Sequence, residues 1–314
     1  MKSLVTGAAG FIGSTLTEKL LKKGHKVIGV DCFIDYYDRS LKENNISSFI
    51  DHDNFILIEE NINKIDLKEL LIDIDYVFHQ AAQAGVRSSW GKDFEIYTHN
   101  NVKGTQKLLE AAKENNIKKF VYASSSSVYG DTDKLPMKET NRLQPVSPYG
   151  VSKLAGENLA YLYYKNFNVP TVSLRYFTVF GERQRPDMAF HIFIKAILED
   201  EKLTIFGDGK QSRNFTHVDD IVKANILAAE SDLVGEIFNI GGDGKRVVLN
   251  DAIDLMEELL GKQANRDYQQ VVKGDVKHTS ADTSKAKKML GYEPEVDFEE
   301  GLAREIEFLK NLYN

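Results

Sequence analysis

A tyrosine and a lysine stand four residues apart, at Tyr149 and Lys153. On a helix, this spacing places both side chains on one face, about one turn apart. A free tyrosine has a pKa of about 10, so only about one phenol in a thousand is ionised at neutral pH, and a nearby positive charge favours ionisation. The pair therefore predicts a phenolate base, Tyr149, supported by the charge of Lys153. The same spacing is common on solvated helices. The surrounding segments must therefore decide whether this pair is catalytic or only a solvated surface pair.

A run of serines, from Ser124 to Ser127, follows the apolar residues 120–123, which are typical of a buried strand. Serine hydroxyls can hydrogen-bond a substrate oxygen and relay its proton. The alternative is a serine-rich surface loop, but the buried strand before it argues against a loop. In a doubly wound sheet, sites form at the carboxyl ends of strands, where we expect this run to meet residues 81–82 and Thr178.

The first turn of the chain contains three glycines, Gly7, Gly10 and Gly13, between an apolar run and a helical pattern over residues 11–21. Such glycines allow a tight turn and a close approach of the backbone to a pyrophosphate at the helix N-terminus. Asp31 follows about 20 residues later, at the end of the second expected strand. A carboxylate there accepts hydrogen bonds from ribose hydroxyls and repels a 2′-phosphate, so the pattern predicts NAD rather than NADP. Outside this context, Asp31 would be a turn or helix-cap residue.

Short apolar runs alternate with amphipathic stretches through the first half of the chain, which predicts βαβ units around a parallel sheet. We therefore expect an α/β fold with a Rossmann-type doubly wound parallel sheet and a smaller mixed α/β substrate-binding lobe. The NAD-binding domain is expected over residues 1–176, with residues 215–241 rejoining it, and the smaller lobe over residues 177–314. The expected strands lie near residues 4–5, 26–30, 55–58, 76–78, 120–123, 169–176 and 236–240, and the expected helices near residues 11–21, 102–112, 148–164, 191–198, 218–229, 250–260 and 299–313.

Composition excludes several classes of function. The 314 residues are 42% hydrophobic and 28% charged, as in an ordinary globular protein. The net charge of -7 argues against a sequence-independent nucleic-acid binder, and the lone Cys32 excludes an internal disulfide framework. We find no signal-peptide core and no segment approaching the roughly 20 apolar residues of a membrane helix. We therefore expect a cytoplasmic protein with neither a membrane nor a nucleic-acid partner, and no metal site.

With these residues in place, the chain resembles the extended short-chain dehydrogenase/reductase family. Within that family it is similar to the nucleotide-sugar epimerases and dehydratases, above all the UDP-glucose and UDP-glucuronate 4-epimerases. The resemblance covers nearly the whole chain. It rests on the glycine turn at residues 7–13 and on residues 79–82, 100–105, 124–130, 147–153, 174–177 and 207–213.

The resemblance implies a bound NAD and a transient ketosugar. In such enzymes the tyrosine removes the 4′-hydroxyl proton, C4′ gives hydride to the nicotinamide, and the ketosugar turns over and takes the hydride back on its other face. Tyr149 would be the base, Ser125 would hydrogen-bond the 4′-oxygen with help from Ser127, and Lys153 would bind the nicotinamide ribose. The implied contacts of NAD are Gly7, Gly10, Phe11, Ile12, Gly13, Asp31, Asn61, Ile62, Ala81, Ala82, Gln83, Asn100, Ser124, Tyr149, Lys153 and Tyr176.

The end of the serine run bears on the reaction type. The 4,6-dehydratases that this chain resembles have Asp-Glu at the equivalent of Ser126 and Ser127, and the glucuronate decarboxylases have a Glu, because their reactions need a carboxyl group beside C5. Without that carboxyl group, epimerisation at C4 is the expected reaction. A net reductase or dehydratase, and a non-catalytic NAD-binding protein, are the alternatives from other classes.

The sugar remains open at this point. We expect interconversion of UDP-glucose and UDP-galactose, with UDP-glucuronate as the alternative substrate, since residues 79–88 and 183–189 resemble both kinds of 4-epimerase. Arg185 either holds a C6 carboxylate or is a loop arginine paired within the protein. The resemblance also implies a homodimer through helices 102–112 and 149–164. The implied UDP-sugar contacts are Arg87, Ser88, Ser125, Ser126, Thr178, Arg185, His191, Thr204, Phe206, Arg213 for the diphosphate, and Asp275.

Overall fold

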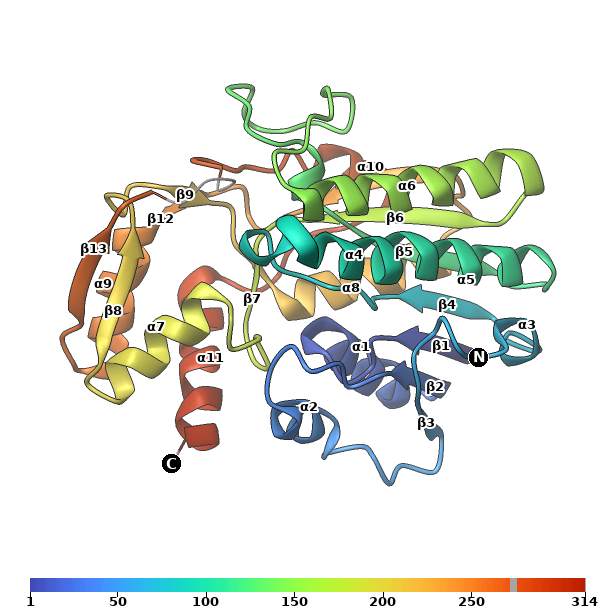
Figure 1. Ribbon diagram of the computed structural model, residues 1–314, viewed down its shortest axis with the longest axis horizontal. Helices are drawn as coiled ribbons and strands as arrows, with labels where there is room; N and C mark the ends of the chain where they lie inside the picture. Colours follow the sequence, from blue (N-terminus) through green and yellow to red (C-terminus); the bar gives the residue numbers. More distant parts are fainter. Residues whose placement is uncertain (272–275, 314) are drawn as a thin grey trace.

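A seven-stranded, wholly parallel sheet forms the centre of the computed structural model, which describes residues 1–271 and 276–313 (Figure 1). Its strand order, β11-β6-β5-β4-β1-β2-β3, reverses direction between β1 and β4, which is the switch point where ligands bind in such sheets. The expected Rossmann-type fold is confirmed. The strands are β1 (Lys2–Thr6), β2 (Lys26–Asp31), β3 (Phe55–Glu59), β4 (Tyr76–His79), β5 (Lys119–Ser125), β6 (Thr171–Tyr176) and β11 (Glu236–Ile240).

Helices cover both faces of this sheet, and each face has its own apolar core. Leu16 and Ile221 belong to the core on one face, while Leu108 and Tyr163 belong to the core on the other. This two-sided burial explains why the strands are nearly continuous apolar runs. One face carries α1 (Phe11–Lys22), α2 (Arg39–Ile46), α8 (Val218–Glu230) and α10 (Ser284–Leu290), and the other carries α3 (Leu67–Leu70), α4 (Phe94–Tyr97), α5 (Gly104–Lys113) and α6 (Pro148–Phe167).

Helix α6 begins and ends with strong local signals. The Ser147 hydroxyl accepts a hydrogen bond from the Gly150 amide at 3.1 Å, and Pro148 occupies the first helical position. At the other end Asn168 adopts a left-handed conformation, with φ of 58°. These caps fix where the helix starts, and so fix the place of Tyr149 and Lys153 in its first turns.

The helix expected over residues 102–112 differs from the structure at its start. Residues Thr98–Lys103 form a π-helical segment, η3, and α5 follows from Gly104. Within η3 the Asn101 side chain accepts a hydrogen bond from the Gln83 amide at 2.7 Å and donates to the Gln83 carbonyl and the Ser152 hydroxyl, each at 2.9 Å. Such wide turns are frequent at functional sites. Here η3 ties the segment after β4 to α6.

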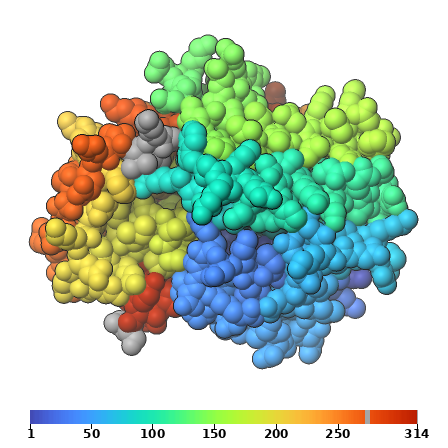
Figure 2. Space-filling model, in the orientation of Figure 1, coloured from blue at the N-terminus to red at the C-terminus, as the bar shows by residue number. Residues whose placement is uncertain are grey.

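A second group of elements has its own apolar core. Its yellow and orange atoms lie beside the blue and green atoms of the first part of the chain (Figure 2). Strand β11 follows α7 and β8 of this group in the chain but pairs with β6 in the first sheet. The parallel pair β8–β13 was not expected, because β13 has a polar sequence. The group contains α7 (Ala189–Leu198), β8 (Lys202–Phe206), α9 (Leu249–Leu260), β13 (Asn265–Gln269) and α11 (Phe298–Tyr313).

Within the described residues, no helix combines the length and the apolar character needed to span a membrane.

Short elements connect the two parts. The short strands β7 (Val179–Phe180) and β10 (Thr216–His217) pair with each other, as do β9 (Ser212–Arg213) and β12 (Val247–Val248), and single turns occur at η1 (Arg87–Ser89), η2 (Gly91–Asp93) and η4 (Ser126–Val128).

Candidate active site

The glycine turn after β1 leaves a cradle that side chains would fill. Gly7 has φ of +71°, and a Cβ there would lie 2.9 Å from the Ala81 amide nitrogen. A Cβ on Gly13 would lie 1.9 Å from the Gly7 carbonyl oxygen, so α1 can pack this closely on the turn only without one. The space left at the N-terminus of α1 suits a dinucleotide pyrophosphate, and the turn therefore fits NAD.

Asp31 ends β2 beside this turn. Its Oδ2 accepts a hydrogen bond from the Ala9 amide at 3.1 Å, and its Oδ1 accepts from the Phe33 amide at 2.8 Å. Lys42 from α2 lies 3.2 Å from the same Oδ1, and both side chains are 6% exposed. Sequence reasoning missed Lys42, because nothing in its neighbourhood marks it as a partner of Asp31.

A cavity opens at the carboxyl ends of the central strands. All sixteen residues expected to contact NAD line its wall, from Gly7 in the first turn to Tyr176 at the end of β6. The wall also includes Arg185, which the sequence places in the substrate group, and the unanticipated Tyr36 and Lys42. The structure thus brings the glycine turn, β2, β4, β5 and α6 to one crevice.

Tyr149 and Lys153 project into this cavity from the first turns of α6. Burial lowers the pKa of Lys153 to about 7, with the Glu157 carboxylate opposing that shift. Burial also raises the pKa of Tyr149, while a hydrogen bond with Ser125 and the positive charge of Arg185 act to lower it. The site therefore keeps a neutral phenol at rest and surrounds it with groups that favour its anion.

The four residues of the serine run have different surroundings and therefore different roles. Ser125 is the serine best placed to bind the substrate, because it hydrogen-bonds Tyr149. Its hydroxyl also accepts from the Ser127 amide at 3.1 Å. Ser126 and Ser127 follow in η4 and are partly exposed. Ser124 lines the cavity, but its hydroxyl donates to the Glu157 carboxylate at 2.6 Å. Its side chain therefore supports the wall from behind.

A buried ion pair lies beneath the catalytic helix. Arg175 donates from Nε and Nη2 to the two Glu157 oxygens at 2.9 and 2.6 Å, and from Nη1 to the Tyr129 hydroxyl at 2.7 Å. The Arg175 and Glu157 side chains are each 2% exposed. Because Glu157 also receives the Ser124 hydroxyl, this pair joins α6, β5 and β6 directly below the reacting groups. Sequence reasoning identified the segment around Arg175 but not its partner.

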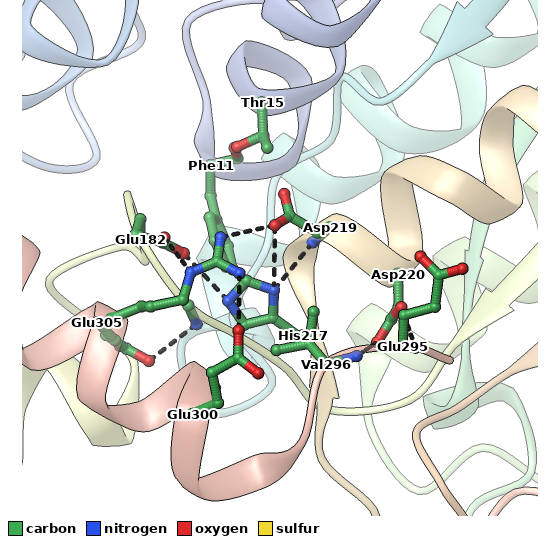
Figure 3. Close-up of polar contacts among 12 residues, drawn as sticks. Phe11, Thr15, Glu182, His217, Asp219, Asp220, Glu295, Val296, Glu300 and Glu305 are labelled. Atoms are coloured by element: carbon green, nitrogen blue, oxygen red, sulfur yellow. Dashed lines mark hydrogen bonds and ion pairs between the residues drawn. The ribbon is translucent and has the colours of Figure 1, made fainter. Parts of the chain in front are cut away.

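The loop between β7 and α7 is anchored at its start, as Figure 3 shows for Glu182. Glu305 of α11 accepts from the Gly181 amide at 2.8 Å, and Glu182 binds both His217 at 3.0 Å and Arg304 at 2.8 Å. Arg183 then pairs with Glu18 of α1 at 2.6 Å. These anchors carry the chain to Arg185 at the cavity wall.

The remaining substrate candidates lie outside that wall. Ser88 bonds the Tyr97 hydroxyl at 2.9 Å, and Thr178 lies just past β6. Arg87 crosses the face of Phe206 at the end of β8, with its guanidinium carbon 4.4 Å from the ring centroid. Thr204 lies within β8, Arg213 donates to the carbonyls of Ser212, Val276 and Lys277, and Asp275 is outside the described residues.

His191, predicted to contact the UDP-sugar, lies in α7. Its Nδ1 is 2.7 Å from the Gln184 carbonyl, its Nε2 is 2.6 Å from the Tyr313 hydroxyl, and the residue is 2% exposed. Both ring nitrogens are therefore engaged within the protein. His191 thus supports the loop that carries Arg185, and its contact with the nucleotide stays a prediction.

The fold and the cavity together define a Rossmann enzyme that binds NAD at the switch point of its sheet. Residues 3–241 match the model of the NAD dependent epimerase/dehydratase family, and the chain belongs to that family. The chain is accordingly NAD-dependent, as expected.

Several known proteins match this chain over nearly its full length. A Bacillus subtilis protein described as an uncharacterized UDP-glucose epimerase, YtcB, is 48% identical over 315 residues, which cover 100% of this chain and 99% of the relative. A UDP-glucuronate 4-epimerase of Thermodesulfobacterium geofontis is 42% identical, covering 98% and 95%. The crystal structure of UDP-glucuronic acid 4-epimerase from Bacillus cereus with UDP-glucuronic acid and NAD is 49% identical, covers 100% of both chains and has a TM-score of 0.97.

Proposed function

We propose that this protein is a UDP-sugar 4-epimerase that retains its NAD and prefers UDP-glucuronate. The family and the similar proteins support the reaction class. The observation that carries the choice of sugar is the guanidinium of Arg185, which lines the same cavity as Tyr149 and is close enough to lower its pKa. A guanidinium there suits a C6 carboxylate, because it offers paired donors in the plane of the two oxygens. The preference thus shifts from glucose, favoured by sequence alone, to glucuronate.

The chain's own residues suffice to hold the sugar and move its proton. NAD, held by the glycine turn and Asp31, supplies a hydride acceptor that later returns the hydride. Ser125 holds the 4′-oxygen within reach of Tyr149, and the Tyr149 phenolate removes its proton. The positive charge of Arg185 favours the phenolate, and Lys153, one helical turn from Tyr149 in the same cavity wall, adds a second cation. When the ketosugar presents its other face, Tyr149 gives the proton back to the 4′-oxygen.

Elimination is disfavoured by the same geometry. Ser126 and Ser127 occupy the turn after β5, and neither can act as a carboxylate acid or base beside C5. The product of the reaction should therefore differ from the substrate only at C4. Accumulation of a free ketosugar would instead favour a dehydratase or another net oxidoreductase.

The reaction is tested with purified protein and no added NAD. We expect the 4-epimer of UDP-glucuronate to appear by NMR or chromatography, and Tyr149→Phe to reduce turnover at least about 10³-fold because the base is lost. Tyr161→Phe is the matched control, since Tyr161 lies on the same helix and is 48% exposed. Near-normal turnover by the Tyr149→Phe variant would overturn the assignment of the base.

The sugar preference has its own test. We expect kcat/KM for UDP-glucuronate to exceed that for UDP-glucose at least about tenfold. Arg185→Met should remove this difference, because it removes a charge-assisted contact worth about 1.5–3 kcal/mol. A wild-type enzyme that prefers UDP-glucose would restore the glucose/galactose hypothesis.

We further propose a homodimer formed through α5 and α6, which pack side by side (Figure 1). The α6 surface exposes Val151 and Leu162, which lie about three turns apart on one face and are 47% and 46% exposed. Exposed apolar side chains on one face of a helix are typical of a subunit interface. Sedimentation should give about twice the monomer mass, and Leu162→Lys should shift it toward the monomer.

A further inference from the structure

Arg185 is held by a carboxylate of its own loop. Its Nε donates to Asp187 Oδ1 at 2.9 Å, and its Nη2 donates to Asp187 Oδ2 at 3.0 Å. Two parallel bonds of this kind fix the plane of a guanidinium as well as its distance. Arg185 is therefore both paired within the protein and part of the cavity wall, so the two interpretations of this arginine hold together.

Asp187 is held in turn from the opposite side of the cleft. The Tyr36 hydroxyl, from the segment between β2 and α2, donates to Asp187 Oδ2 at 3.1 Å. Burial alone would raise the pKa of Asp187, but the charge and hydrogen bonds of Arg185, together with Tyr36, outweigh burial and lower it. The carboxylate is thus anionic at neutral pH, and its two oxygens face Arg185.

The edge of the guanidinium that Asp187 occupies decides which edge is left for a ligand. A guanidinium has five N–H donors in one plane, and Asp187 uses those of Nε and one of Nη2. The outer edge, formed by Nη1 and Nη2, retains a parallel pair of donors. Since Arg185 lines the cavity of Tyr149, a sugar carboxylate can meet that outer edge.

We propose that Asp187 is the positioning residue that makes Arg185 selective for a carboxylate: it binds the inner edge of the guanidinium and so presents the outer edge to the C6 group of the sugar. This inference rests on the proposed function. It assigns the choice between a charged and a neutral C6 group to a three-residue chain of contacts, Tyr36 to Asp187 to Arg185.

The loop itself does not depend on Asp187 for its path. Gly181 is fixed by Glu305 and Arg183 by Glu18, while Gln184 accepts from the His191 amide at 3.0 Å. Replacing Asp187 by the isosteric asparagine should therefore leave the loop in place. What changes is the hold on the guanidinium, which loses its charge-assisted fork.

The test compares two sugars that differ at C6, UDP-glucuronate and UDP-glucose, in the wild type and the Asp187→Asn variant. We expect kcat/KM for UDP-glucuronate to fall at least tenfold more than that for UDP-glucose, mainly through a higher KM. Tyr36→Phe should move the same ratio in the same direction by a smaller factor. In an Arg185→Met background, Asp187→Asn should change the ratio less than twofold, because there is no guanidinium left to orient.

Each other outcome overturns the inference. Equal losses for both sugars would make Asp187 a structural residue, and a lower KM for UDP-glucuronate would make it a competitor of the substrate. An unchanged ratio would show that Arg185 needs no positioning. The wild-type arm separates this inference from the proposed function: a wild type that fails to epimerise UDP-glucuronate defeats the function, whereas a wild type that epimerises it and a variant with an unmoved ratio defeat only the role of Asp187.

Discussion

The pKa values of Tyr149 and Lys153 depend strongly on the burial of the two side chains. Burial works against both charged forms, raising the pKa of the phenol and lowering that of the ammonium to about 7. Lys153 follows Tyr149 by about one helical turn and lines the same cavity, so its positive charge favours the phenolate once that forms. Catalysis near neutral pH thus depends on the ammonium more than it would in an exposed pair.

The first prediction is that Lys153→Met moves the pH dependence of kcat to higher pH. Without the ammonium, the phenolate keeps only the help of Ser125 and Arg185, so the pKa of Tyr149 rises and a more alkaline solution is needed to ionise it. We expect kcat at pH 7 to fall by about 10²-fold or more, with partial recovery toward pH 9. The check is a kcat–pH profile of NAD-loaded protein. A profile that falls uniformly at every pH would contradict the electrostatic role.

A second residue-scale prediction concerns the choice between NAD and NADP. In the Asp31→Asn variant, Lys42 becomes a buried cation without its carboxylate, 3.2 Å from the former charge. A 2′-phosphate would neutralise it, so we expect the ratio of NADP to NAD affinity to rise at least about tenfold. The affinities are measured by titrating cofactor-free protein. Asp31→Asn combined with Lys42→Met is the control, and a gain of NADP binding as large in that double variant as in Asp31→Asn would refute the role of Lys42.

At the scale of elements, α1 packs so closely on the turn before it that Gly13 has no room for a side chain. Gly13→Ala would place a Cβ 1.9 Å from the Gly7 carbonyl oxygen, whereas Gly10→Ala would place one 3.3 Å from the same atom. We expect the first change to cost about 2–3 kcal/mol of unfolding free energy and the second less than about 1 kcal/mol, because only the first forces the backbone to move. Urea unfolding of cofactor-free protein checks both. Equal losses would show that the helix can shift at little cost.

Elements with strong periodicity could be predicted from sequence, and those stabilised only by tertiary pairing could not. The strands of the main sheet are apolar because helices cover both faces, and this shows in residues 120–123. Strand β13 is polar and exists only because β8 pairs with it, so no local pattern marks it.

The same division holds within the site. Glycines, the serine run and the Tyr149–Lys153 spacing are local patterns, and the cavity wall contains the three glycines, Ser124, Tyr149 and Lys153. The partners of these residues come from distant parts of the chain: Lys42 reaches Asp31 from α2, and Tyr36 reaches Asp187 across 151 positions. Such pairings depend on the packed fold and leave no local trace.

At the scale of the whole molecule, helix α11 joins the second group of elements to the short strands β7 and β10 and, through Arg304 and Asp219, to α8 (Figure 3). Its two adjacent residues Arg304 and Glu305 bind Glu182 and Gly181, which begin the loop of Arg185. Burial alone would raise the pKa of Glu182, but hydrogen bonds from His217 and Arg304 help to bring it down to about 2. Burial raises the pKa of Glu305 well above its usual range, with Gly181 opposing the shift and Glu182 adding to it.

These two carboxyls predict opposite effects in separate pH windows. Glu182 contributes stability above its ordinary pKa of 4.5, and this is lost as the pH falls toward about 2. Glu305 keeps its proton above 4.5 in the folded chain while the unfolded chain releases it, so it lowers stability as the pH rises from there toward its folded pKa.

Glu305→Gln should therefore stabilise the protein relative to the wild type, and this stabilisation should grow from pH 5 to pH 8. The amide cannot lose a proton, and its oxygen can still accept from the Gly181 amide. We expect a gain of about 1 kcal/mol or more at pH 8 that vanishes below pH 4.5, where both states of the wild type hold the proton. Thermal unfolding of wild type and variant across this range measures it, with the exposed Glu307→Gln as the control on the same helix. A gain independent of pH would mean that Glu305 is already ionised in the folded protein, and that α11 carries a buried negative charge at the joint between the two parts of the molecule.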